Sequence, residues 1–281
     1  MTLLPLTRSL AHPSTDPPTL VARVREALGW SGSDFLVGLE GYDELMATID
    51  VAHDVEALVR IGDPTSPPLR LLRGLNSLAP ELRLSSVTSL PSPWRWTRLG
   101  GSTADAQGVA LRQQTYSDVL EAMRRAGVGF RVLPDDATTD ELLAAGEEVG
   151  SAVVDVDELR PDDVLIVGFL EQLRPLTFGL LTRAPLEHAA VDAAWLSMRP
   201  ERETAGTLMV ALEQVSALGI DLDFLHSDPL GAGHHDFHIG FRADAARVTA
   251  LQEALSAVGF GSRVLAAFEQ VEPVEPVEPA R

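Results

Sequence analysis

The chain has 281 residues with 22 basic and 41 acidic side chains, so its formal net charge at pH 7 is −19, and every basic residue is Arg because the sequence contains no Lys. This acidic balance disfavours binding to nucleic acid or anionic lipid, and the absence of Cys excludes disulfides, a thiolate nucleophile and Cys-based metal sites. No apolar run approaches the roughly 18–20 residues of a membrane span, and the first residues lack the layout of a secretory signal, so we expect a cytoplasmic protein that acts on a small molecule.

The N-terminal region combines a polar segment with short periodic stretches. Residues 1–18 are rich in Pro, Ser and Thr, so we expect them to be disordered. Apolar residues at helical spacing predict a helix over 19–28, and the apolar run 35–39 predicts a buried strand followed by an amphipathic stretch. Gly and Pro mark a loop at 62–68, and the pattern over 69–78 favours neither helix nor strand.

The middle of the chain alternates between strand and helix patterns. Two amphipathic segments, 116–126 and 138–148, are predicted helices, the second with Thr138 or Thr139 as its N-cap. This alternation is typical of an α/β architecture. The predicted strands are short and rich in apolar or β-branched residues: 82–89, 94–98, 109–113, 128–133, 152–156, 164–169 and 178–182.

The pattern changes after about residue 192. Strand and helix signals follow one another there in the order β-α-β-β-α-β, which is the ferredoxin-like arrangement. Val-Glu-Pro then repeats near the end of the chain, and we expect a disordered tail because Pro and charge oppose packing. The predicted elements are strands at 195–198, 221–227, 236–241 and 263–268 and helices at 203–218 and 245–258.

Landmarks in the last module occur in an order known from one family. Ala205-Gly206-Thr207-Leu208 opens the first helix, His226-Ser227-Asp228-Pro229 follows on the second strand, and Val264–Phe268 closes the module. They resemble the Gly-Ala-Leu, Glu-Ser-Arg-Pro and Val-Leu-Gly-x-Tyr motifs of the ACT domain that follows the catalytic part of prephenate dehydratases.

The resemblance implies an amino-acid effector site, which in the family binds phenylalanine at a dimer interface. Physically, a Gly turn lets the backbone approach a small ligand, and the helix N-terminus after it attracts a carboxylate. His226 and Asp228 replace the Glu and Arg of the family motif, so the ionic partners differ. The alternative is that Gly206 only starts a helix. The effector-binding candidates are Gly206, Thr207, Leu208, His226, Ser227 and Asp228.

The first module resembles the catalytic part of the same family. Residues 33–40 are similar to the strand that ends in the family's Glu-Asn-Ser motif; Glu40 matches, whereas Gly41 and Tyr42 replace the other two residues. Thr138 matches the Ser-Thr pair that opens a helix at the cleft. The implied fold is a two-lobed, periplasmic-binding-protein-like α/β module, followed by the ferredoxin-like ACT module. The predicted domains are a disordered N-terminus (1–18), the dehydratase-like module (19–188), the ACT module (192–269) and a disordered tail (270–281).

Dehydration of prephenate expels the ring hydroxyl as water while the ring carboxylate leaves as carbon dioxide. Such a site needs a cationic anchor for carboxylates and a hydrogen-bond donor for the departing hydroxyl. In the family, the Thr and Arg of a Thr-Arg-Phe motif have these roles. Here Phe178 matches, but Leu176 and Thr177 occupy the other two positions. Thr177 is therefore the displaced donor candidate, and Arg174 or Arg183 is the anchor candidate; as strand residues they could equally face solvent.

Three other groups of residues have chemical interest. His234, Asp236 and His238 would share one side of a strand at metal-ligand spacing, or form a solvated hairpin. Trp94 and Trp96 could stack on a ligand ring or pack in the core. Ser102-Thr103 after two Gly residues could form a phosphate nest, but without a Lys it is no P-loop.

Two hypotheses result. The first is a prephenate dehydratase-like enzyme of phenylalanine biosynthesis, a lyase with Glu40, Thr138, Thr177 and Arg174 as catalytic candidates and with neither cofactor nor metal. The second is a non-catalytic sensor that binds an amino acid and regulates a partner. In both, the ligand is small and acidic, so it requires a local Arg pocket in an acidic protein. The ACT resemblance implies a homodimer.

Overall fold

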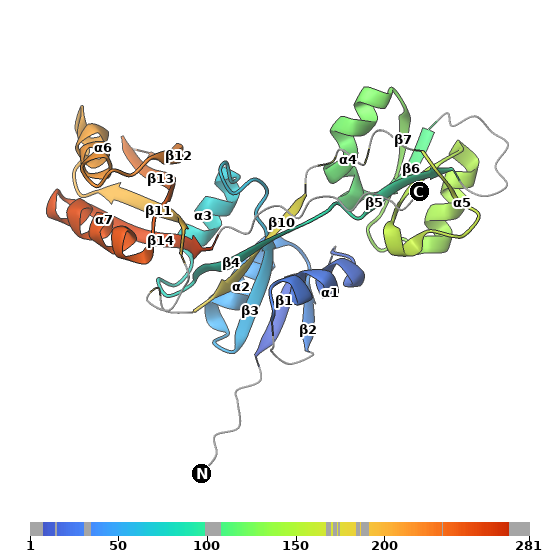
Figure 1. The fold of residues 1–281 in the computed structure, drawn as a ribbon, viewed down its shortest axis with the longest axis horizontal. Coiled ribbons are helices and arrows are strands. Elements are labelled where there is room, and N and C mark those ends of the chain that lie inside the picture. The colour runs from blue at the N-terminus through green and yellow to red at the C-terminus, as the bar shows by residue number, and fades with distance from the viewer. Residues whose placement is uncertain are drawn as a thin grey trace, which may run out of the picture. The chain divides into compact units, whose positions relative to one another are not determined.

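The computed structural model describes residues 8–14, 16–30, 35–98, 108–166, 170, 173, 175–183, 186, 191–231 and 233–269. The tail 270–281, Ser102-Thr103 and Arg174 lie outside these ranges. The chain divides into two compact units. We call them the large unit, made of the described residues of 8–14, 24–89 and 177–269, and the small unit, made of those of 16–23 and 90–176. Figure 1 shows the helices and strands of both units.

The large unit is built on a nine-stranded sheet in the order β12-β13-β11-β14-β4-β10-β3-β1-β2. Strands β1, β2 and β3 are parallel, and β10 runs antiparallel beside β3. The strands are β1 (Ser9–Pro13), β2 (Leu36–Leu39), β3 (Val55–Arg60), β4 (Arg83–Leu90), β10 (Leu176–Thr182), β11 (Ala193–Pro200), β12 (Leu222–Gly231), β13 (His234–Arg242) and β14 (Phe260–Phe268).

The last four strands and helices α6 (Thr207–Ala217) and α7 (Ala245–Ala257) form the predicted β-α-β-β-α-β order, which is confirmed. Figure 1 shows both helices beside these four strands. We call the four strands the C-terminal sheet. Alternate residues of β11 and β13, among them Leu196 and Ile239, face the helices and form a core with them. Alternation puts the other side chains of the two strands on the opposite face.

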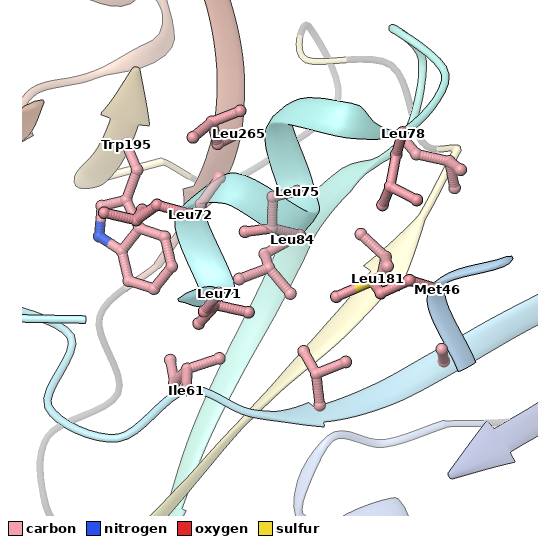
Figure 2. Close-up of a cluster of buried hydrophobic side chains, with 14 of the residues drawn as sticks. Met46, Ile61, Leu71, Leu72, Leu75, Leu78, Leu84, Leu181, Trp195 and Leu265 are labelled. Atoms are coloured by element: carbon pink, nitrogen blue, oxygen red, sulfur yellow. The ribbon is translucent and has the colours of Figure 1, made fainter. Parts of the chain in front are cut away.

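Helix α3 (Leu69–Ser77) covers that opposite face. Its Leu71, Leu72 and Leu75 belong to one buried core together with Trp195 of β11 and Leu265 of β14. Figure 2 shows these leucines beside Trp195 and Leu265, with Leu84 and Leu181 of β4 and β10 in the same cluster. The core also includes residues of α2 (Tyr42–Val51), so α3 joins the C-terminal sheet to the N-terminal strands in one hydrophobic interior.

The small unit contains a five-stranded sheet in the order β7-β6-β8-β5-β9. Strands β6, β7 and β8 are parallel, and β5 is antiparallel to β8. Its elements are β5 (Trp94–Arg98), β6 (Gly108–Arg112), α4 (Gln113–Ala126), β7 (Gly129–Leu133), α5 (Thr139–Val149), β8 (Ala152–Asp155), the short 3-10 helix η1 (Val156–Glu158) and β9 (Val164–Leu165). The division between the two units falls within α1 (Pro18–Ala27).

The two tryptophans of β5 are core residues. Trp94 and Trp96 are both buried in the small unit's core. Their indole nitrogens donate to the carboxylate of Asp118 and the hydroxyl of Ser151, both at 2.9 Å. The alternative that they stack on a ligand ring is therefore wrong.

Four sequence expectations need correction. Residues 9–13 are not disordered but form β1, a buried strand between β2 and β3 whose few apolar residues are hidden in a Pro- and Ser-rich segment. Strand β2 is not buried: it lies at the sheet edge, and Phe35 beside it is 73% exposed. Residues 69–77 are a helix, and α6 begins at Thr207 because Gly206 has a left-handed backbone (φ 89°).

Among the described residues, no helix is long and apolar enough to cross a membrane.

Candidate functional site

The carboxyl ends of β1, β2 and β3 form one edge of the large unit's sheet, and ligands of α/β proteins commonly bind at such an edge. Glu40 directly follows β2, and Thr177 lies near the start of β10, which runs antiparallel to β3. Both predicted residues are therefore at this edge. Three strand spacings separate β10 from β2, which puts them about 14 Å apart.

Thr177 is held by hydrogen bonds on both its backbone and its side chain. The residue is 8% exposed, and its carbonyl accepts a hydrogen bond from the Ile61 amide at 3.0 Å. Its hydroxyl lies 3.0 Å from the Ser89 hydroxyl of β4. Two hydroxyls in contact can donate one proton to each other and one onward, so the pair retains a donor for a ligand at the rim of the sheet.

Arg60, the last residue of β3, is a cation that the sequence analysis missed. It lies directly opposite Phe178 in the strand register, and its guanidinium carbon is 5.5 Å from the centre of the Phe178 ring. Stacking on an aromatic face holds a guanidinium in place. Thr177 and Arg60 project to opposite faces of the sheet, because adjacent residues of a strand alternate, so a single ligand could contact both only at the ends of these strands.

Glu40 is exposed, and the carboxylate of Glu44 lies beside it. Its backbone amide donates to the Glu44 carboxylate at 2.6 Å, so the chain's own carboxylate occupies this start of α2. Tyr42, at the family's hydroxyl position, packs under Arg70, whose guanidinium carbon is 5.6 Å from its ring, and burial raises the pKa of its phenol. Tyr42 is thus a neutral packing residue.

Arg183 does not serve the carboxyl edge. It follows the far end of β10, and its guanidinium donates to the carbonyls of Ile49, Asp50 and Ala52 at 2.8–3.0 Å. These carbonyls end α2, where a cation also complements the helix dipole. The expectation that Arg183 could be the carboxylate anchor is wrong. Arg174, the other anchor candidate, lies outside the described residues.

Thr138 belongs to the small unit. It is the N-cap of α5, as the sequence predicts: its hydroxyl accepts from the Glu141 amide, and the Glu141 carboxylate accepts from the Thr138 amide. This capping box satisfies the helix start internally. Its catalytic role, like those of Glu40, Thr177 and Arg174, stays a prediction.

The small unit's own carboxyl edge carries a neutralised arginine. Arg112 at the end of β6 donates to both carboxylate oxygens of Glu158, at 2.8 and 3.1 Å. Burial raises the pKa of Glu158, but the hydrogen bonds from Arg112 and Thr139 outweigh it and the pKa is lowered. The guanidinium of Arg112 is therefore already paired with a carboxylate of the same unit through two hydrogen bonds.

The predicted effector residues fall on two faces of the C-terminal sheet. Gly206 and Thr207 line a hollow of about 260 Å³ that also contains Arg202 and Phe260. Asp228 lies on the other face, where its carboxylate pairs with Arg73 of α3. His226 shares that face with Asp228, two residues along β12, whereas Ser227 points to the helix side. The hollow thus combines the cation of Arg202 with the start of α6. Binding of an effector there stays a prediction.

The histidines of β13 do not form a metal site in this structure. Within the described ranges, no group of three or more His, Cys, Asp or Glu is arranged to hold a metal ion. His234 is exposed, whereas Asp236 and His238 are buried.

A scan against protein-family models and a search of curated proteins find no match. Solved structures do match. The prephenate dehydratase from Staphylococcus aureus subsp. aureus Mu50 is 13% identical, with 93% of this chain and 100% of that chain covered and a TM-score of 0.68. The prephenate dehydratase from Arthrobacter aurescens, in complex with L-Phe, is 15% identical (96% and 93% covered, TM-score 0.69). A further match is GqqA, described as a novel type of quorum quenching acylase, at 16% identity (94% and 98% covered, TM-score 0.63).

These likenesses extend over nearly the whole chain, and the chain has the fold of prephenate dehydratases. The predicted α/β fold class is confirmed. At such low identity the likeness shows the fold and leaves the reaction open, as the acylase with the same fold illustrates.

Proposed function

We propose that this protein is a cytoplasmic, homodimeric lyase of phenylalanine biosynthesis that catalyses the decarboxylating dehydration of prephenate or a related cyclohexadienyl acid. The main support for the proposal is a cation at the carboxyl ends of the strands: the guanidinium of Arg60 stacks on the ring of Phe178. Arg60 is paired with Phe178 in the strand register, and Thr177 is the residue before Phe178. Phe178 matches the family's Thr-Arg-Phe motif, and the guanidinium absent from β10 is supplied by the neighbouring strand.

In the proposed reaction, Arg60 binds a substrate carboxylate through a charge-assisted, two-pronged contact. The Thr177–Ser89 hydroxyl pair donates a hydrogen bond to the ring hydroxyl as its carbon–oxygen bond breaks, and the hydroxide that leaves takes up a proton from solvent to become water. The carboxylate on the same ring leaves as carbon dioxide, and its bonding electrons complete the aromatic ring. Donors placed where charge develops are typically worth about 10²–10³ in rate.

The regulatory part of the proposal is an amino-acid effector at the hollow beside Gly206. The support is the ACT-like module and the L-Phe complex of the Arthrobacter aurescens structure, whose fold this chain shares. Since His226 and Asp228 replace the ionic residues of the family motif, the effector need not be phenylalanine.

Turnover of prephenate tests the proposal. Full-length protein is incubated with prephenate, and phenylpyruvate is followed by its absorbance. We expect Thr177→Val to lower kcat by about 10²-fold. Thr182→Val is the matched control, because the Thr182 hydroxyl also bonds a β4 serine, Ser85, at 3.0 Å, but at the opposite end of β10. The control should keep kcat unchanged.

Absence of phenylpyruvate at high protein concentration would refute the enzyme hypothesis. A thermal-shift screen with prephenate and aromatic amino acids then decides the alternative. Stabilisation by an amino acid without any turnover would identify the non-catalytic sensor.

A further inference from the structure

A layer of polar side chains is enclosed between α3 and the C-terminal sheet. The strand register places His226 opposite His238, and Asp228 opposite Asp236. Residues two apart on a strand share a face, so the four side chains form a square on the face that α3 covers. Asp228, Asp236 and His238 are each less than 5% exposed.

The two carboxylates of this layer bind arginines and tie α3 to the sheet. Arg73 of α3 donates from Nε to Asp228 at 2.7 Å, with a second contact from Nη2. Asn76, one turn later on α3, donates to Asp236 at 3.0 Å. Asp236 also accepts from Arg199 of β11 at 2.6 Å. Both carboxylates are thus fully engaged with cations or amides.

The two imidazoles of the layer, in contrast, have buried ring nitrogens without hydrogen-bond partners in the part of the chain that the structure describes. His238 is 1% exposed, and among the described residues neither of its ring nitrogens has a hydrogen-bond partner. The same holds for Nε2 of His226. A buried polar group without a partner is rare in folded proteins and calls for a physical explanation.

The pairing of charges in the layer makes the buried imidazole of His238 sensitive to protons. The carboxylates of Asp228 and Asp236 are already paired with Arg73 and Arg199. An added proton creates a buried cation that must take a carboxylate from an arginine or reach water. The charged and titratable groups that face His238 from every packed element are His226 and Asp228 (β12), Asp236 (β13), Arg199 (β11), Arg263 (β14) and Arg73 (α3).

We propose that this layer is a proton-sensitive contact, which holds α3 on the C-terminal sheet while His238 is neutral and weakens when His238 takes up a proton. If the imidazolium takes Asp228, Arg73 loses its partner; if it takes Asp236, Asn76 and Arg199 lose theirs. In both cases α3 loses a hydrogen-bonded tie to the sheet.

Release of α3 would reach the carboxyl edge of the sheet. The loop 62–68 connects β3, which ends at Arg60, to α3. Trp195 of β11 fixes this loop by donating from its indole nitrogen to the Pro64 carbonyl at 3.1 Å. This consequence rests on the proposed function, whereas the contact itself does not.

Hydrogen–deuterium exchange of the full chain tests the contact without any substrate. Rates are corrected for the intrinsic pH dependence and compared between about pH 7.5 and about pH 5.5, on either side of an exposed histidine's pKa of about 6.5. Burial lowers the pKa of His238, so opening takes up a proton only below pH 6.5. The opening constant of α3 should then rise by up to about tenfold per pH unit for the one proton taken up by His238, while helix α5 stays unchanged.

Variants identify the groups responsible. His226→Gln with His238→Gln should abolish the pH dependence, whereas His234→Gln, at an exposed position of the same strand, should preserve it. Because the double variant changes buried positions, a histidine NMR titration of the unmodified chain gives a second readout: one imidazole should protonate below the exposed ones.

Two results would overturn the proposal. The first is exchange of α3 that does not change with pH in the unmodified chain. The second is Zn²⁺ slowing the exchange of α3 only when both histidines are present, which would make the pair a metal site.

Discussion

At the residue scale, the tightest constraint lies at Gly240 of β13. The ring of Phe224, on the neighbouring strand β12, lies where a side chain at position 240 would be, with its Cζ only 2.8 Å from an added Cβ. Phe224 cannot easily yield, because it is buried and packs edge-on against Trp195 with ring centres 6.2 Å apart. This packing joins the C-terminal sheet to the core under α3.

Gly240→Ala should therefore destabilise the protein by about 1–3 kcal/mol, the usual cost of overpacking a rigid core. Gly261→Ala is the matched control on β14 of the same sheet, because the nearest atom to an added Cβ is 3.9 Å away. Urea unfolding should show a lower midpoint for the first variant only. Equal midpoints would mean that Phe224 moves aside freely.

The residues of the candidate site could be predicted only where the signal lies within a short stretch of sequence. Thr138 as a helix cap follows from local sequence, and its capping box confirms it. Arg60 was missed because its importance depends on lying opposite Phe178, a register between strands more than 100 residues apart in sequence. Spacing within one strand suggested Arg183 instead, which ends up capping α2.

At the element scale, strong periodic signals predicted the fold well and weak ones did not. The β-α-β-β-α-β order was readable because each element is long and bounded by Gly or charged turns. Helix α3 was not, because its short apolar stripe of Leu71, Leu72 and Leu75 follows two prolines. Strand β1 was hidden because its sequence holds only two aliphatic residues, Leu10 and Ala11, instead of the continuous apolar run typical of a buried parallel strand.

The ends of β6 and η1 are held together by the Arg112–Glu158 pair, whose side chains are 16% and 20% exposed. The pKa of Glu158 is lowered despite its burial, through hydrogen bonds from Arg112 and Thr139. A carboxyl with a lowered folded-state pKa stabilises the protein above its unfolded pKa of about 4.3, and this contribution is lost as the pH falls through the folded value.

Glu158→Gln should thus cost about 1.5–3 kcal/mol at pH 7 and less below about pH 4. The matched control is Glu148→Gln, since Glu148 pairs with Arg131 in the same unit but at 65% and 45% exposure. That change should cost about 0–1 kcal/mol. Chemical unfolding at both pH values measures the two differences; a cost for Glu158→Gln that is the same at both would contradict the assignment.

At the scale of the whole molecule, a net charge of −19 with every cation an Arg shapes both stability and binding. Like charges repel one another in the folded protein, and several arginines pair with carboxylates, among them those of Asp228, Asp236 and Glu158.

Salt should stabilise this protein. Raising NaCl from about 0.01 M to about 0.15 M shortens the Debye length from about 30 Å to about 8 Å and screens the net repulsion. We expect the unfolding midpoint to rise by about 2–4 °C, equivalent to about 1 kcal/mol. A midpoint that falls with NaCl would show that paired charges outweigh the net repulsion.

The central claim is that Arg60 supplies the carboxylate anchor of a dehydratase. The most direct measurement is kcat/KM for prephenate of Arg60→Gln beside Arg70→Gln, because Arg70 likewise stacks on an aromatic ring, that of Tyr42, but is exposed on α3. Loss of a charged hydrogen bond of about 3 kcal/mol predicts a decrease of about 100-fold for Arg60→Gln and none for Arg70→Gln. Equal values of kcat/KM for Arg60→Gln and the unmodified protein would show that Arg60 does not anchor the substrate carboxylate.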